Sequence, residues 1–362
     1  MQLSVIILAH NKNELTIACL KAIRSADLPN PFEVLLVDNA SNPSLKQSLD
    51  EELLKSTNTK ILRNSKNLNF SIANNIAAEM AQGEFLLFLN NDVEISGDTV
   101  LHLMQTIKKD QGPSLVGGML LYPNSKLVQH AGVSHMLWGI GSNYGCGAKS
   151  DEKALNFKRE IYGVIGAMML IKKKWFRKVG GFDENYNWGY EDIDLCQRIR
   201  AIGGRIFYEP KASAIHHEST TLKEKISKKR DSLNYQYFRS RWDELLIPAE
   251  TTLINKYKNL GIRSVAIYGT GNAAIELGKR LAMVNIQTQA FISELPSSIT
   301  FEGKPVYNLS QIDSDKFDQI FIGSQYHFEI SKMLKKFVYC TVITTISFAI
   351  IYLLMKFEYL NL

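Results

Sequence analysis

Two carboxylates stand directly after apolar runs that are typical of buried β-strands. Asp38 follows Phe32–Val37, and Asp92 ends the polar triplet that follows Phe85–Leu89. In open α/β sheets, ligands bind in the crevice beside the carboxyl ends of the strands. Carboxylate and amide oxygens there would suit Mg²⁺ or Mn²⁺, which would in turn hold a diphosphate. Asp38 could accept a hydrogen bond from a pyrimidine base, although an Asp after a strand is also a common turn or cap residue.

A second acidic pair, Glu191 and Asp192, opens a helical pattern after a turn that contains Gly189 and Tyr190. Acids at a helix start are stabilised by the helix dipole, which explains the composition by itself. The dipole would also lower the pKa of Asp192 and keep it ionised as a general base at neutral pH. The stretch therefore predicts either a charged helix start or a catalytic base.

Two histidines, His216 and His217, follow the predicted strand Phe207–Pro210. Neutral imidazole binds Mn²⁺ or Zn²⁺, so one of them could complete a metal shell begun by Asp92. Neighbouring side chains in an extended segment point to opposite sides, so at most one histidine is expected to face the site. A surface histidine pair is the alternative.

A glycine turn lies in the last third of the chain. The run Gly269–Ala274 follows the apolar strand Ser264–Tyr268 and has the pattern G-x-G-x-x-A. Its bare backbone could approach a pyrophosphate at a helix start. The acid expected about 20 residues later is absent from Gln289–Ser293, so we expect a nucleotide-binding type of fold without an assigned cofactor.

The elements that must position these residues alternate between short apolar runs and helical patterns up to about Lys211. Such alternation is typical of βαβ units around a largely parallel sheet. Strands are predicted at Leu3–Ala9, Phe32–Val37, Lys60–Arg63, Phe85–Leu89, Leu115–Leu121 and Val164–Ile171. Helices are predicted at Glu14–Arg24, Ile72–Ala81 and Thr99–Lys108, and a glycine-rich loop at Gly139–Gly147.

Composition shifts divide the chain into four parts. We expect a first domain over 1–220, a charged helical connection over 221–260, a smaller Rossmann-like α/β domain over 261–336 and an uncharged segment over 337–355. The last segment, Phe337–Met355, could span a bilayer core of about 30 Å or could be a buried strand and helix. The basic run Lys223–Arg230 could meet anionic lipid headgroups or form a solvated helix face.

The overall composition is that of an ordinary globular protein. The chain has 362 residues, of which 45% are hydrophobic and 22% charged. Its net charge of +6 is too weak to indicate a nucleic-acid partner. Four distant cysteines argue against a zinc site or a disulfide framework, and the first residues do not resemble a signal peptide. These features favour a cytoplasmic protein.

Taken in order, the motifs resemble the family 2 glycosyltransferases of the GT-A fold, particularly the bacterial rhamnosyl- and galactofuranosyltransferase-like branch. The resemblance covers about Leu3–Trp242. Its pieces are SVIILAHNKNELTIACLKAI, LLVDNAS, NLNFSIANNIAAEMAQGEFLLFLNND, GAMMLIKKKWFRKVGGFDENY, WGYEDIDLCQRI and IHHES. It implies a mixed sheet flanked by helices, while the block after Gly261 separately resembles the short Rossmann-like modules found beside sugar-processing enzymes.

The resemblance also implies a donor-binding group. Asp38 matches the acid that recognises the base, and Ala9 and Asn11 match the first loop around the nucleotide. Asn67 and Asn75 match the stretch beside the diphosphate. The remaining donor-binding positions are Asn90, Gly166 and Ala167, the last two near the sugar and the acceptor.

The chemistry implied by the resemblance is inverting transfer of a sugar from a UDP- or dTDP-sugar to a hydroxyl of a saccharide. Asp192 matches the catalytic base and Glu191 its partner, while Asp92 and His216 match the ligands of Mn²⁺ or Mg²⁺. Insertion of the last segment would place the enzyme at the cytoplasmic face of a membrane, where a lipid-linked acceptor would be accessible. The alternatives are a nicotinamide-dependent oxidoreductase using the glycine turn and a catalytically silent nucleotide-sugar binding protein.

Overall fold

The computed structural model describes residues 1–133, 143–187, 189–217, 225–294, 296, 298–313 and 316–323. The predicted loop Gly139–Gly147, the basic run Lys223–Arg230 and the uncharged segment Phe337–Met355 lie wholly or partly outside these ranges. Within the described ranges, no helix has the length and apolar character needed to cross a membrane.

The chain divides into two compact units, and each is described by itself. The first comprises Met1–Val133 with Lys149–Ser240, and the second comprises Ser134–Ala148 with Arg241–Leu362. The helix α7 spans Lys225–Asn259 and contributes residues to both units. Most of the predicted charged connection over 221–260 is therefore helical.

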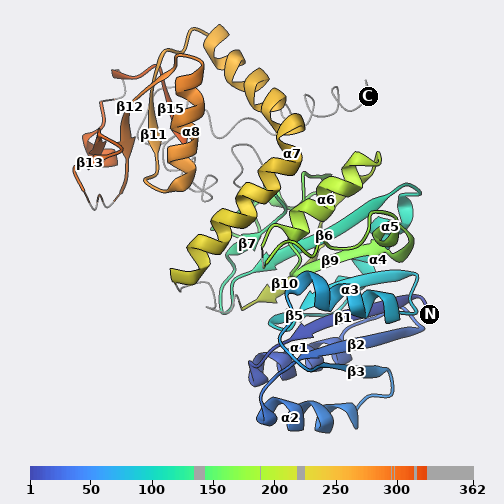
Figure 1. The fold of residues 1–362 in the computed structure, drawn as a ribbon. Coiled ribbons are helices and arrows are strands. Elements are labelled where there is room, and N and C mark those ends of the chain that lie inside the picture. The colour runs from blue at the N-terminus through green and yellow to red at the C-terminus, as the bar shows by residue number, and fades with distance from the viewer. Residues whose placement is uncertain are drawn as a thin grey trace. The chain divides into compact units, whose positions relative to one another are not determined.

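The first unit is a mixed α/β layer structure (Figure 1). Its strands are β1 (Leu3–Ala9), β2 (Phe32–Asn39), β3 (Thr59–Asn64), β4 (Phe85–Asn90), β5 (Val93–Ile95), β6 (Ser114–Leu121), β7 (Val128–His130), β8 (Arg159–Glu160), β9 (Met168–Lys172) and β10 (Arg205–His216). Its helices are α1 (Asn13–Ser25), α2 (Pro43–Leu53), α3 (Phe70–Met80), α4 (Thr99–Lys109), α5 (Lys173–Lys178), α6 (Glu191–Ala201) and the first part of α7.

One sheet organises this unit, in the order β3-β2-β1-β4-β9-β6-β10-β5, with β7 beside β6 and β8 beside β10. Strands β3, β2, β1 and β4 run parallel, as does the pair β6 and β10, whereas β9 is antiparallel to both of its neighbours. The sheet is therefore mixed, and it agrees with the sheet that the family resemblance implies.

Burial explains why the central strands form. All seven residues of β1 are buried, as are seven of the eight in β2, because helices cover both faces of a largely parallel sheet. A side-chain cap sets the start of α3. Asn69 Oδ1 accepts a hydrogen bond from Ile72 N at 2.8 Å, so α3 begins at Phe70, two residues earlier than predicted.

Several elements differ from the prediction. The predicted strand Val164–Ile171 begins only at Met168. The predicted strand Phe207–Pro210 is part of the longer strand β10, which extends to His216. Helix α2 was not predicted, although Asn42 as its cap and Pro43 at its first position are typical helix-start residues.

The second unit holds a five-stranded sheet in the order β13-β14-β12-β11-β15. Its strands are β11 (Ser264–Tyr268), β12 (Gln287–Ile292), β13 (Thr300–Phe301), β14 (Lys304–Tyr307) and β15 (Gln319–Ile322), and its helix α8 spans Asn272–Met283. Strand β12 starts earlier than the predicted Phe291–Ser293, and α8 packs against β12 and β11. The predicted order of strand, glycine turn and helix is confirmed.

Close packing accounts for the glycine turn of this unit. Gly269 has a φ of +120°, and a Cβ there would lie 2.7 Å from the carbonyl oxygen of Gly323. A Cβ on Gly323 would in turn lie 2.7 Å from the Cα of Ala274. These three small residues let β11, β15 and α8 approach one another, so the turn does not by itself indicate a cofactor.

Candidate active site

The carboxyl ends of the parallel strands bring several predicted donor-site residues to one edge of the first sheet. Ala9 lies opposite Asp38 across β1 and β2, and Leu8 lies opposite Asn90 across β1 and β4. Asp38 in turn lies opposite Arg63 on β3. Ligands of α/β sheets bind at such edges, so this is the first part of a candidate site.

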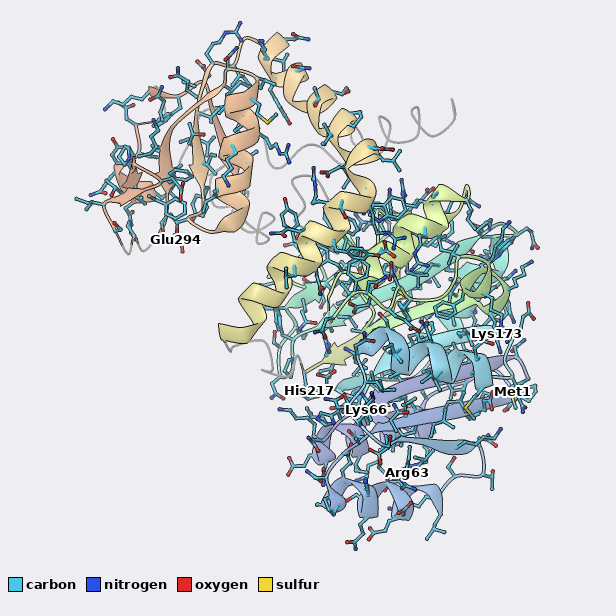
Figure 2. The ribbon with its side chains drawn as sticks, viewed as in Figure 1. Met1, Arg63, Lys66, Lys173, His217 and Glu294 are labelled. Carbon is cyan, nitrogen blue, oxygen red and sulfur yellow. The ribbon has the colours of Figure 1, made fainter. Side chains whose placement is uncertain are left out.

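Asp38 is fully buried at this edge. Its Oδ1 accepts a hydrogen bond from Ser41 N at 2.9 Å, which is the bond expected of a turn residue. Its Oδ2 faces the Nε of Arg63 at 3.4 Å, and Arg63 also binds Asp50 at 2.7 Å. Arg63 is labelled in Figure 2. One carboxylate oxygen therefore shapes the turn, while the other lies beside a cation that the sequence prediction did not include.

The loops after β1 and β2 are tied to each other. Asn11 has a φ of +57°; its backbone N–H donates to Ser41 Oγ at 3.1 Å, and its Oδ1 accepts from Asn42 N at 2.9 Å. His10 Nδ1 lies 2.9 Å from the carbonyl oxygen of Asn39. These contacts hold the predicted nucleotide loop against the turn that Asp38 shapes.

Asn39 organises a third loop, a role that no sequence signal indicated. Its Nδ2 donates to Asn67 Oδ1 at 2.7 Å and to the carbonyl oxygen of Leu68 at 2.8 Å. Its Oδ1 accepts from Leu68 N at 3.0 Å and from Asn64 Nδ2 at 2.8 Å. Asn39 is fully buried, so it connects the predicted residue Asn67 to the end of β2.

Backbone hydrogen bonds connect the predicted base to the same sheet edge. Asn90 N donates to the carbonyl oxygen of Ala167 at 3.0 Å, and the adjacent Gly166 N donates to Asp192 Oδ2 at 2.9 Å. Asp192 Oδ1 accepts from Ile193 N at 2.8 Å. The structure therefore brings four of the predicted residues together from β4, from the segment before β9 and from α6.

Burial raises the pKa of Asp192 above its usual range. The backbone N–H groups of Gly166 and Ile193 lower it, but their effect is smaller than that of burial. The prediction that the helix dipole would lower this pKa is therefore wrong, because loss of water around a carboxylate disfavours its charged form. A carboxylate with a raised pKa is a stronger general base, because its pKa lies closer to neutral pH.

Glu191 and helix α7 hold the turn that precedes Asp192. Gly189 and Tyr190 have left-handed φ values of 104° and 74°, and Glu191 Oε2 accepts from Gly189 N at 2.6 Å. Asn234 Nδ2 on α7 donates to the carbonyl oxygen of Gly189 at 3.0 Å, and Phe238 stacks 5.6 Å from the ring of Tyr190. Glu191 thus acts on the backbone of the turn, and Asn234 is a positioning residue that sequence reasoning missed.

The predicted metal ligands converge beside β5. His216 Nε2 lies 3.3 Å from Asp92 Oδ1, and both side chains are largely buried. His217 points to a different carboxylate, Glu94, and its backbone N–H donates to the carbonyl oxygen of Asp92 at 3.0 Å. Figure 2 labels His217 near the end of β10. The two histidines therefore diverge, as their extended backbone predicts.

The pair Asp92 and His216 fits a divalent cation. One cation can bind two donor atoms at about 2.1 Å each only if the two atoms lie within about 4 Å of each other. The two donor atoms here are 3.3 Å apart, and a carboxylate with an imidazole suits Mn²⁺. Within the described residues, no group of three or more His, Cys, Asp or Glu side chains is arranged to hold a metal ion.

Asn75 does not join this group. Its Nδ2 donates to the carbonyl oxygen of Phe182 at 2.9 Å and to Glu184 Oε1 at 3.0 Å. Its Oδ1 accepts from Phe182 N at 2.9 Å. Both ends of the amide therefore hold the loop after α5, and the position of Asn75 beside the diphosphate stays a prediction.

Three protein families match successive parts of the chain. Residues 4–180 match the family described as glycosyl transferase family 2. Residues 149–223 match a family described as N-terminal domain of galactosyltransferase, and residues 261–341 match one described as C2185-like, N-terminal.

Curated relatives cover between half and two thirds of the chain. The uncharacterized protein y4gI of Sinorhizobium fredii is 29% identical over 249 residues, covering 66% of this chain and 27% of that protein. The O-antigen biosynthesis protein RfbC of Myxococcus xanthus is 32% identical, covering 52% and 15%. An N-acetylglucosaminyl-diphospho-decaprenol L-rhamnosyltransferase of Mycobacterium tuberculosis is 24% identical, covering 52% and 67%. The chain thus spans less than a third of the length of the first two relatives.

Solved structures share the fold. GalNAc-T7, determined with UDP, GalNAc and Mn²⁺, has a TM-score of 0.51 and 21% identity, covering 60% of this chain and 44% of that one. The mannosyltransferase PcManGT of Pyrobaculum calidifontis, determined with GDP-Man and Mn²⁺, has a TM-score of 0.50 and 15% identity, covering 66% and 64%. Residues 4–180 of this chain therefore form a glycosyl transferase family 2 domain with a GT-A-like fold.

Proposed function

We propose that the first unit transfers a sugar, with inversion, from a nucleoside diphosphate sugar to a hydroxyl of a saccharide. The observation that supports this most strongly is the hydrogen-bonded path from Asn90 through Ala167 and Gly166 to Asp192. These bonds connect the Asp192 carboxylate, whose pKa is raised, to the sheet edge that also holds Asp38 and the pair formed by Asp92 and His216.

The reaction we propose is a single displacement. The acceptor hydroxyl attacks the anomeric carbon while Asp192 accepts its proton, and the bond from that carbon to the diphosphate oxygen breaks. Asp38 would bind the base of the donor, and the Asn11 and Asn67 loops would flank the nucleotide. A divalent cation held by Asp92 and His216 would offset the charge of the departing diphosphate.

The comparisons support particular classes of donor and acceptor. Relatives act in O-antigen biosynthesis and on a lipid-linked sugar, and the two solved structures hold UDP or GDP-Man with Mn²⁺. We propose a UDP- or dTDP-sugar as the donor, Mn²⁺ or Mg²⁺ as the cofactor, and a lipid-linked saccharide of the cell envelope as the acceptor. The enzyme would then act at the cytoplasmic face of a membrane.

Release of nucleoside diphosphate tests the proposed function. The chain is incubated with UDP-, dTDP- and GDP-sugars, with Mn²⁺ or with EDTA, and with or without a membrane extract as the acceptor source. We expect metal-dependent release from one donor that rises when the extract is added. Binding of a nucleotide sugar without turnover under every condition would favour a silent binding protein, and release from no donor with binding of NADH would favour an oxidoreductase.

The raised pKa of Asp192 predicts how activity depends on pH. Only the ionised carboxylate accepts a proton, so kcat/KM should fall on acidification around a midpoint above 3.8, the ordinary value for Asp. The measurement is kcat/KM between about pH 4 and pH 8, with circular dichroism at each pH to confirm an intact fold. A profile that stays flat down to about pH 4 would contradict a raised pKa at the base.

A further inference from the structure

A buried glutamine contacts the predicted metal histidine on the side away from Asp92. Gln129 lies on β7, and its Oε1 is 2.6 Å from the Nδ1 of His216. Its Nε2 donates to the backbone carbonyl oxygen of the same histidine at 3.5 Å. Gln129 is 6% exposed, so its amide meets the histidine largely out of contact with water.

These two contacts determine the proton position on the ring. The carbonyl oxygen of His216 can only accept, so the amide of Gln129 must turn its NH₂ group toward it. The amide oxygen then faces Nδ1 and can only accept, so Nδ1 must carry the proton. In the neutral ring the lone pair therefore lies on Nε2, the atom that faces Asp92 Oδ1 at 3.3 Å.

We propose that Gln129 is a positioning residue that presents the Nε2 lone pair of His216 to a divalent cation shared with Asp92. The proposal rests on the proposed function, which supplies the cation. A ligating histidine commonly donates its other ring N–H to a fixed acceptor, and loss of that acceptor weakens metal binding by about 10–100-fold. No sequence signal pointed to Gln129, because it lies 87 residues from His216.

The adjacent histidine provides an internal comparison. His217 directs Nε2, not Nδ1, toward the carboxylate of Glu94. A carboxylate accepts, so His217 is expected to carry its proton on Nε2. The His216 Nε2 also faces a carboxylate, so the two rings should show opposite tautomers when a cation lies between His216 and Asp92. A purely structural role for Gln129 does not require this difference.

Two variants separate the hydrogen bond from packing. Gln129→Leu removes the acceptor and keeps most of the volume, whereas Gln129→Glu keeps an acceptor oxygen beside Nδ1. Mn²⁺ binding to the full chain is measured by electron paramagnetic resonance of free Mn²⁺, with and without UDP. We expect the apparent Kd of Gln129→Leu to rise about 10–100-fold and that of Gln129→Glu to stay near the wild-type value.

Nitrogen NMR of ¹⁵N-histidine-labelled wild-type protein, saturated with diamagnetic Mg²⁺ and UDP, gives a second readout. His216 is assigned with a His216→Asn variant, and it should show the Nδ1–H tautomer while His217 shows the Nε2–H tautomer. If Gln129→Leu does not fold, Gln129→Met replaces it, and the wild-type spectrum still tests the proposal.

The outcomes distinguish this inference from the proposed function. Wild-type binding of Mn²⁺ together with unchanged binding in Gln129→Leu would overturn the role of Gln129 and leave the metal-dependent transferase intact. An Nε2–H tautomer at His216 would overturn it in the same way. Absence of Mn²⁺ binding in the wild-type protein, with UDP present, would overturn both this inference and the metal part of the proposed function.

Discussion

Replacing Asp192 by asparagine is expected to lower kcat by about 10²–10⁴-fold, which is the usual contribution of a general base. The KM for the donor should change little, because the amide oxygen can still accept from the N–H of Gly166. Steady-state kinetics with the donor identified by the release assay measure both constants. An unchanged kcat would remove Asp192 from the role of base.

Stability of the same variant gives an independent check. The pKa of Asp192 is raised in the folded protein, so its stabilising contribution exists at acid pH and is lost as pH rises through that pKa. Asparagine cannot ionise, so Asp192→Asn should have a Tm at neutral pH that is no lower than that of the wild type. A lower Tm would indicate that the carboxylate is needed for folding, and the loss of kcat would then need correction for unfolded protein.

Asp38→Asn is the matched control for Asp192→Asn. It also exchanges a buried carboxylate at the sheet edge for an amide, and it keeps the oxygen that accepts from Ser41 N. A hydrogen bond to a charged group contributes about 1.5–3 kcal/mol, so the donor KM should rise about 10-fold or more with kcat little changed. Opposite kinetic signatures in the two variants would separate donor binding from proton transfer.

Replacing Asp92 by alanine is the second large effect that we expect. If a divalent cation stabilises the departing diphosphate by several kcal/mol, kcat should fall by at least about 10²-fold. EDTA should lower wild-type activity similarly, and added Mn²⁺ should restore the wild type but not the variant. Nucleoside diphosphate release across a Mn²⁺ titration measures this difference.

Glu94→Gln is the matched control for Asp92→Ala. Glu94 is the neighbouring carboxylate that pairs with the other histidine, His217. We expect this variant to keep the Mn²⁺ dependence of the wild type, because Glu94 does not face His216. Loss of Mn²⁺ dependence in Glu94→Gln, with its retention in Asp92→Ala, would move the metal to the pair formed by Glu94 and His217.

Local patterns predicted the strands that build the candidate site, because buried strands need continuous apolar runs and polar residues must end them. The run Phe85–Leu89 and the residues after it therefore identified both β4 and the position of Asp92. The same patterns failed at Val164–Ala167, where the apolar residues are not part of the strand. Their backbone instead turns so that Gly166 N can reach Asp192, a partner that lies 26 residues later.

The sequence by itself determined which residues carry titratable or metal-binding groups, the family and the order of most elements, because these depend on residue type and short-range periodicity. Only the tertiary structure decided the raised pKa of Asp192, the commitment of Asn75 to a loop and the contacts of Asn39, Asn234 and Gln129. Burial and hydrogen bonding depend on which distant segments meet. The spacing of residues along the chain does not predict which distant segments make those contacts.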